Sequence, residues 1–345
     1  MLAEGRIGAG LSETSVKCGS TAVEDSGWRS ILCVLSEGRV ETKETVGVSS
    51  TSSSSRISDR VKAESLWSKS FRRFRQNRGA VIGLGVIIFL VLVAIGAPWI
   101  TRYDPLFQDL TEALLSPSAE HFFGTDQYGR DVYTRVVYGA RISPRAGLIS
   151  AGISCLLGIP LGLLAAYYMG WMDALIMRLV DVMLAFPGML LALAIMAVLG
   201  PSLTNTLIAA GLAHVPDYIR ITRGSVLSVK EMDYVTAARA IGAPDRYIMV
   251  RHILPNVLLP LIVFTSLEIA GAILVVAGLS FLGLGAQPPT PEWGAMLTVG
   301  RDYVREAWWL PVFPGLAITL TVLAMNLVGE GMRDALDPRL TIKKQ

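Results

Sequence analysis

The run AVIGLGVIIFLVLVAIGAPWI at residues 80–100 contains no charged side chain. A helix needs about 20 apolar residues to cross the roughly 30 Å hydrocarbon core of a bilayer, and this run has that length. Because lipid offers the backbone no hydrogen-bond partner, a spanning segment must satisfy its own amides and carbonyls, which a helix does and a single strand does not. The run therefore predicts a transmembrane helix.

The rest of the chain extends this pattern. It has 345 residues, of which 52% are apolar and 17% are charged, against about 25% charged residues in soluble domains. Five further apolar runs approach the length of a span, and they cover residues 146–169, 175–199, 203–221, 257–282 and 308–328. The run at 175–199 contains Arg178, Asp181 and Pro187, and the run at 203–221 is the least apolar. We therefore expect an all-α, polytopic membrane protein with six transmembrane helices.

The net charge of +3 is unevenly distributed. Residues 56–78, just before the first apolar run, hold eight Lys/Arg and two acidic residues. A solvated basic face and a nucleic-acid site are alternatives, but basic residues beside a span are typically retained on the cytoplasmic side. Six spans then place both termini and the loop 222–256 in the cytoplasm. We therefore expect the chain to lie in a lipid bilayer and to bind no nucleic acid.

Residues 1–60 differ in composition from the rest of the chain. They include the run SSTSSSS at residues 49–55 and show no sustained period, which indicates either a disordered or a mis-annotated N-terminal extension. The expected organisation of the remaining residues is a basic lead with the first span (61–100), an extracytoplasmic loop (101–144), a core domain (145–334) that includes the loop 222–256, and a cytoplasmic tail (335–345).

Motifs for covalent chemistry are missing. The sequence has no G-x-x-x-x-G-K-[ST] to hold ATP phosphates, no G-x-S-x-G and no H-E-x-x-H. Its three cysteines and three histidines are scattered and include no C-x-x-C pair. We therefore predict no catalytic residue, no metal site and no cofactor bound by this chain.

The loop between the fourth and fifth runs reads VKEMDYVTAARAIGAPDRYIMVRHILPN at residues 229–256. Apolar residues recur at helical spacing, and Gly242 is a natural helix stop because glycine adopts positive φ without strain. Pro244 suits the first turn of a second helix, which we expect to end at Pro255. The first helix would present Tyr234, Ala237, Ala238 and Ile241 on one face, with Ala240 and Ala243 as further small residues. From the residues alone, a loop packed on its own bundle and a knob for a partner protein are equally favoured.

Other features concern helix packing and polar groups within the apolar runs. Gly158 and Gly162 form a small-xxx-small face that predicts close helix packing. Glu268 lies near the centre of the fifth run, where a carboxylate is costly and must face a polar interior or a partner, or be protonated. The i,i+3 pair Arg178–Asp181 and the i,i+4 pair Asp131–Arg135 are predicted ion pairs.

The residues Ala237-Ala238-(three)-Gly242-(eleven)-Leu254-Pro255 resemble the EAA loop of binding-protein-dependent ABC importer permeases, although Thr236 stands where that family usually has Glu. Further stretches resemble signatures of the C-type permease of the dipeptide, oligopeptide and nickel importer group. They are HFFGTDQYGRDVYTRVVYGAR (121–141), RLVDVMLAFP (178–187), LSFLGLG (279–285), PPTPEWG (288–294) and DALDPR (334–339). The resemblance spans about residues 67–341.

This resemblance implies a type I ABC importer transmembrane domain in a bacterial or archaeal inner membrane. Its partners would be a second homologous permease in a heterodimer, two ATP-binding subunits that carry ATP and Mg, and an extracytoplasmic solute-binding protein. Peptides would cross by alternating access, and nickel, glutathione and opines are alternative substrates. A stand-alone proton-coupled transporter using Glu268, Asp217 and His214 is a rival of another class, and an intramembrane enzyme is a second rival for which no catalytic pair is found.

The resemblance also implies candidate site residues. The ATPase-docking candidates are Tyr234, Thr236, Ala237, Ala238, Ala240, Gly242, Ala243, Asp245 and Arg246. The translocation-path candidates are Asp181, His214, Asp217, Glu268 and Asn326, and the candidates for contact with the binding protein are Gln287, Glu292 and Trp293.

Overall fold

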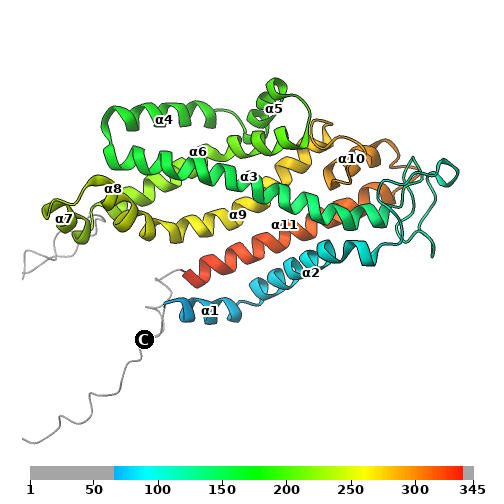
Figure 1. Ribbon diagram of the computed structural model, residues 1–345, viewed down its shortest axis with the longest axis horizontal. Helices are drawn as coiled ribbons and strands as arrows, with labels where there is room; N and C mark the ends of the chain where they lie inside the picture. Colours follow the sequence, from blue (N-terminus) through cyan, green and yellow to red (C-terminus); the bar gives the residue numbers. More distant parts are fainter. Residues whose placement is uncertain (1–65, 337–345) are drawn as a thin grey trace, which may run out of the picture. The chain divides into compact units, whose positions relative to one another are not determined.

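The computed structural model describes residues 66–336, with side chains from residue 71 onward (Figure 1). The predictions for residues 1–60 and for most of the tail 335–345 therefore lie outside the described residues. The helices are α1 (Leu66–Gln76), α2 (Arg78–Ile100), α3 (Val132–Tyr168), α4 (Gly170–Leu184), α5 (Gly188–Leu199), α6 (Leu203–Lys230), α7 (Asp233–Ala240), α8 (Asp245–Tyr247), α9 (Leu254–Phe281), α10 (Trp293–Asp302) and α11 (Trp309–Leu336). A 3₁₀ turn, η1 (Leu110–Glu112), and a π turn, η2 (Ile248–Ile253), complete them.

The all-α, polytopic class is confirmed, but the count of six spans is not matched. Within residues 66–336, four helical stretches are long and apolar enough to cross a membrane: α2, α3, the stretch 245–281 and α11. A fifth span is reached only if α4 and α5, which meet at 95°, are taken as one broken span. Helix α6 has 28 residues, but it is not among the stretches that are apolar enough.

The break between α4 and α5 occurs at Pro187, inside the run that we predicted as one span. Proline disfavours the helical conformation in the residue before it and donates no backbone hydrogen bond. Pro187 therefore starts a new helix as the N-cap of α5, with φ −54° and ψ 133°. The chain changes direction there by 95°, so α4 and α5 do not form one continuous helix.

The prediction that Pro255 ends a helix is wrong. The chain stays helical from Asp245 to Phe281, a stretch of 37 residues. Immediately before the proline, the amide of Leu254 donates to the carbonyl of Met249, five residues back, which is the bonding of a π turn. The hydrogen-bond register changes there, and Pro255 falls within the first turn of α9, where a missing amide costs little.

Close contacts at glycine hold α3 against its neighbours, as the small-xxx-small face predicts. A Cβ added at Gly158 would lie 2.3 Å from the Cβ of Tyr218 on α6, and one at Gly162 would lie 2.7 Å from the carbonyl of Ile219. Nearer the start of α3, Gly147 packs in the same way on Ile273 of α9. Helix α3 is therefore the central element to which α6 and α9 are fixed.

The two ends of the bundle carry different elements. Helices α7 and α8 lie at one end, and α10 lies with the loop 101–131 at the other (Figure 1). At the α10 end, Arg130 pairs with Asp126 at 2.7 Å, while Asp131 caps α3 by accepting from the amide of Thr134 at 2.8 Å. The predicted Asp131–Arg135 pair is therefore wrong: Asp131 contacts His121 at 3.0 Å instead, and these groups are buried rather than on an outer surface.

Candidate functional site

The first candidate site is the elbow, which we define as residues 233–247. Helix α7 ends at a glycine turn: Gly242 has φ +78°, which confirms it as the predicted helix stop. The amide of Ala243 donates to the carbonyl of Ala238 at 3.1 Å, and the amide of Gly242 donates to that of Arg239 at 3.0 Å. This pair of bonds is a Schellman motif, which satisfies the last carbonyls of α7 and fixes its angle to the next helix.

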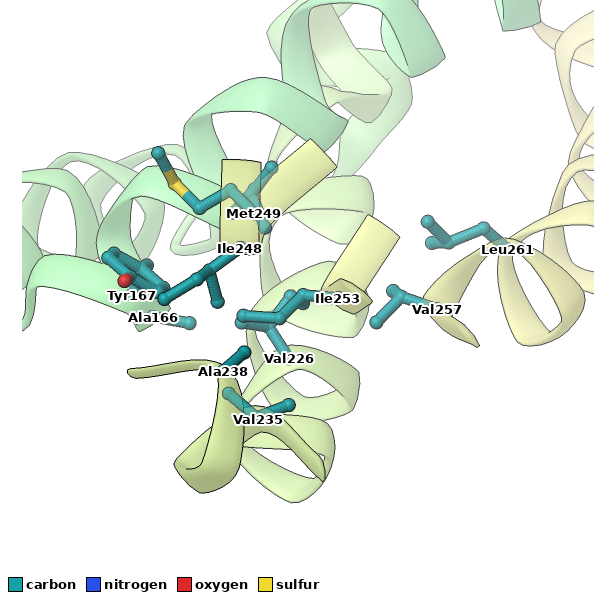
Figure 2. Packing of buried hydrophobic residues seen from close by; sticks show 11 residues of the cluster. Ala166, Tyr167, Val226, Val235, Ala238, Ile248, Met249, Ile253, Val257 and Leu261 are labelled. Carbon is teal, nitrogen blue, oxygen red and sulfur yellow. The ribbon is translucent and has the colours of Figure 1, made fainter. Parts of the chain in front are cut away.

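The inner side of the elbow packs on its own bundle. Val235 is fully buried and Ala238 nearly so, and both belong to a cluster with Val226 of α6 and with Ile248 and Ile253 of η2 (Figure 2). Figure 2 shows these side chains converging from α6, α7 and η2. One of the two alternatives left open by the sequence, a loop packed on its own bundle, therefore holds for this side.

The outer side presents apolar side chains away from the core of the bundle. Ile241 is 85% exposed and Tyr234 is 43% exposed, and Ala237 lies exposed between them at helical spacing. The four residues predicted to share one face therefore do not: Ala238 points into the bundle, and the other three point outward. Of the other docking candidates, Thr236, Ala240, Gly242, Asp245 and Arg246 are exposed, and Ala243 is half-buried.

Polar contacts tie the elbow to the end of α3. The hydroxyl of Tyr167 donates to Oδ1 of Asp245 at 2.6 Å. Nζ of Lys230, the last residue of α6, donates to the carbonyls of Tyr167 at 2.7 Å and of Ala166 at 3.3 Å. Those carbonyls belong to the last turn of α3 and have no partner within the helix. The elbow is therefore braced by α3, α6 and η2 together.

Removing one brace should loosen the elbow. In Tyr167→Phe, the amides of residues 233–247 are expected to exchange with deuterium about five- to tenfold faster, because a hydrogen bond to a charged group contributes roughly 1.5–3 kcal/mol and part of it is replaced by water. Hydrogen-exchange mass spectrometry measures this. Tyr168→Phe is the matched control, since that ring packs beside Tyr167 and is 47% exposed. Equal exchange in the two variants would show that the Tyr167–Asp245 bond does not brace the elbow.

The second candidate site is a polar cluster between α6 and α9. Nδ1 of His214 lies 2.5 Å from Oε1 of Glu268 and 3.9 Å from Oδ2 of Asp217. The side chains of His214 and Glu268 are 17% and 13% exposed, and that of Asp217 is 44% exposed. The structure thus brings together three of the five predicted translocation-path residues. One imidazole nitrogen therefore faces both carboxylates, and a polar partner lowers the cost of placing Glu268 within a span.

The remaining two path candidates lie elsewhere. Oδ1 of Asp181 on α4 accepts from Nη2 of Arg220 on α6 at 3.3 Å, so the predicted Arg178–Asp181 pair is wrong. Asn326 lies half-buried on α11, and within residues 66–336 no hydrogen bond joins it to the cluster. Both pairs that join α4 to α6 were missed, because their members are far apart in the sequence. The stronger pair is bidentate: Nε and Nη2 of Arg223 donate to the two carboxylate oxygens of Asp173 at 2.6 and 2.7 Å.

At the opposite end lie the three residues predicted to contact the binding protein. Glu292 and Trp293 are fully buried. The carboxylate of Glu292 accepts from the amides of Gly294 and Ala295 and from the hydroxyl of Ser143. The Trp293 indole donates to the carbonyl of Val136 at 2.9 Å. They hold α10 on α3 in this conformation, and Gln287 alone of the three is exposed.

No group of three or more His, Cys, Asp or Glu side chains in the described part of the chain is placed to hold a metal ion.

The family models and the similar sequences found by comparison are all membrane components or permeases of transport systems. The family model described as "Binding-protein-dependent transport system inner membrane component" matches residues 158–342, and the "N-terminal TM domain of oligopeptide transport permease C" matches residues 65–117. The dipeptide transport system permease protein DppC of Alkalihalophilus pseudofirmus is 46% identical over 82% of this chain and 93% of its own length.

Two further relatives are similarly close. The di/tripeptide transport system permease protein DppC of Pseudomonas aeruginosa is 49% identical, over 78% of this chain and 91% of its own. The glutathione transport system permease protein GsiD of Escherichia coli is 48% identical, over 79% of this chain and 91% of its own. Among solved structures, the inward-facing methionine ABC transporter MetNI matches with a TM-score of 0.48 and 17% identity, over 58% of this chain and 95% of the other.

Proposed function

This chain belongs to the family of binding-protein-dependent transport system inner membrane components, and we propose that it forms half of the translocation path of an ATP-driven importer of short peptides. It is a permease subunit of a multi-pass membrane type. The observation that carries the proposal is the elbow, which presents Tyr234, Ala237 and Ile241 outward while its inner side is braced by three elements. Exposed apolar side chains on a rigid helix are suited to bind in a groove on an ATP-binding subunit.

The proposed assembly has two permeases, two ATP-binding subunits and one solute-binding protein. ATP and Mg belong to the ATP-binding subunits, which would receive the elbow on the cytoplasmic side. Closure of those subunits would draw the two elbows together. Because the elbow is fixed to α3, α6 and α9, its movement would tilt these helices as a unit and expose the path alternately to each side. The solute-binding protein would dock at the α10 end, where Gln287 is exposed.

Short peptides are the proposed substrate class. The relatives are named for dipeptides, di/tripeptides and glutathione, which are all small molecules built from amide-linked amino acids. The cluster of His214, Asp217 and Glu268 supplies polar groups between α6 and α9 that such molecules could use on their way. Nickel chelates and opines are alternatives, and the same uptake assay tests them as unlabelled competitors.

The test is uptake of a radiolabelled dipeptide by proteoliposomes that contain the full chain with its co-purified partner subunits. Uptake is expected to require both ATP inside and the loaded binding protein outside, and to change less than about twofold when the pH gradient is collapsed, because the driving force is ATP hydrolysis on the partner subunits. Uptake that follows the pH gradient and ignores ATP would instead support the proton-coupled rival.

Glu268→Gln separates the same two alternatives from the protein side. The amide keeps the size of the carboxylate and cannot carry a proton or pair ionically with His214 at 2.5 Å. For the importer, ATP dependence of the remaining uptake is expected to persist. For a proton-coupled carrier, the response to pH would be lost with the carboxylate. Ser266→Ala, on the same helix, is the control for general effects of substitution in α9.

A further inference from the structure

A groove on the flank of the bundle, formed by α2, α3 and α11, belongs neither to the elbow nor to the polar cluster. Its volume is about 590 Å³, and most of its lining is apolar. Val91 and Ile95 of α2 and Leu148 of α3 line it and are each more than half exposed. Pockets of roughly 300–1,000 Å³ commonly hold ligands of the size of drugs, so the groove has room for a long apolar chain.

Two arginines face this apolar groove. Arg141 and Arg145 both line it, and its lining contains no acidic residue. Arginine in a spanning segment is costly unless it is paired or reaches the headgroup region. The groove therefore combines an apolar surface with an uncompensated positive charge.

Arg141 is engaged by the backbone of α2. Pro98 has no amide, so the carbonyl of Ala94, four residues before it, lacks its partner within the helix. The guanidinium of Arg141 donates to that carbonyl and, at 3.0 Å, to the carbonyl of Ile95. It also lies over the ring of Tyr138, at 5.3 Å from the centroid. These contacts fix its position but leave its charge unpaired.

Arg145 lies one turn further along α3 and is exposed. Within residues 66–336 its guanidinium makes neither an ion pair nor a hydrogen bond. The level of Arg141 follows from α2: Ile95, whose carbonyl Arg141 contacts, lies five residues before the end of that helix at Ile100, or about 7.5 Å along its axis. Arg145 lies about 6 Å further from that end, but helical side chains tilt toward the N-terminus of their helix, which for α3 is the end near Ile100. Trp99, which is 82% exposed, marks this end as the membrane interface. A long arginine side chain can reach phosphate headgroups from that depth.

We propose that the α2–α3–α11 groove binds an anionic phospholipid, with its acyl chain along Val91, Ile95 and Leu148 and its phosphate on Arg145 beside Arg141. The planar guanidinium matches phosphate oxygens and keeps its charge at every physiological pH. A spanning helix of a partner protein would need a buried carboxylate at this level to pair with Arg145. A lipid brings its anion at the interface, where hydration is partly retained.

The test is native mass spectrometry of the full-length chain in its purified complex, titrated with phosphatidylglycerol or phosphatidylcholine of identical acyl chains. The wild type is expected to retain phosphatidylglycerol at least about fivefold more tightly, since each basic side chain near an anionic lipid contributes about that factor. Arg145→Gln is expected to lose the preference. Arg145→Lys is expected to keep most of it, which separates the loss of charge from a failure to fold.

Arg305→Gln is the matched control, because Arg305 is an exposed arginine at the same end of the bundle but outside the groove lining. It should leave the preference for phosphatidylglycerol unchanged. Equal retention of the two lipids by the wild type, or a preference that survives Arg145→Gln, would overturn the proposal. So would an Arg145→Gln variant that dissociates the two permeases without changing lipid retention, since the guanidinium would then pair with the partner subunit.

Discussion

Leucine in place of Gly158 or Gly162 is expected to reduce the yield of folded permease at least tenfold. A Cβ at Gly158 would lie 2.3 Å from the Cβ of Tyr218, and one at Gly162 would lie 2.7 Å from a backbone carbonyl of α6. Neither neighbour can move easily, because Tyr218 is fully buried and the carbonyl belongs to a helix. Overpacking a well-packed contact costs about 1–3 kcal/mol or more. This contact joins the two helices that have more buried residues than any other helix of the described chain.

The control is in the same helix. Gly152 of α3 has nothing within 4 Å of an added Cβ, so Gly152→Leu should leave the protein folded. Size-exclusion chromatography of detergent-solubilised membranes, followed by a fluorescent fusion tag, measures the monodisperse fraction of each variant. If Gly158→Leu and Gly152→Leu gave the same fraction, the close approach of α3 and α6 would not be required for folding.

The sequence predicted features that depend on short-range chemistry. Long apolar runs predicted α2, α3, α9 and α11, since the bilayer allows such a segment few other conformations. Gly242 was found from its neighbours because a positive φ at a helix end favours glycine regardless of the rest of the fold. Gly158 and Gly162 were found because their spacing alone puts them on one face.

Features that depend on which helices meet were not predicted. Asp181 was assigned to Arg178 three residues away, whereas its partner Arg220 lies on another helix. Trp293 was predicted to contact a partner from an outer loop. Its ring instead packs on Gly139 of α3, which has no Cβ and so leaves room for the indole. The sequence also did not distinguish Pro187 from Pro255. Both residues lack a backbone amide, but a π turn beside Pro255 keeps the chain helical, whereas no such turn precedes Pro187.

The polar cluster lies between these extremes. A costly carboxylate at position 268 predicted that some partner must exist, and His214 was already among the candidates. Their meeting at 2.5 Å requires α6 and α9 to lie side by side in one register, which their own sequences do not specify. That register is set by α3, through Gly147 against α9 and Gly158 against α6. The cluster is therefore a consequence of glycine packing on a third helix.

Aspartate in place of Ile241 is expected to release the ATP-binding subunits from the complex while the permease itself stays folded. The side chain is 85% exposed, so the substitution disturbs little within the chain. In the proposed complex, the side chain at position 241 would be buried in a groove of the ATP-binding subunit. Loss of one buried isoleucine costs about 1.5–3 kcal/mol, and an unpaired carboxylate in the interface adds a desolvation cost. The apolar loss alone corresponds to roughly ten- to hundredfold weaker association.

Ser228→Asp gives the matched comparison, because it adds the same charge at an exposed position of α6 near the elbow but outside α7. Co-purification of the ATP-binding subunit with tagged permease should fall for Ile241→Asp and persist for Ser228→Asp, and peptide uptake should follow. The brace of Val235 and Ala238 on the inner side makes this test specific to docking, since it holds α7 in place whatever residue stands at position 241. If Ile241→Asp retained both the ATP-binding subunit and uptake, the exposed side of the elbow would not be the docking surface, and force from ATP hydrolysis would have to enter the bundle elsewhere.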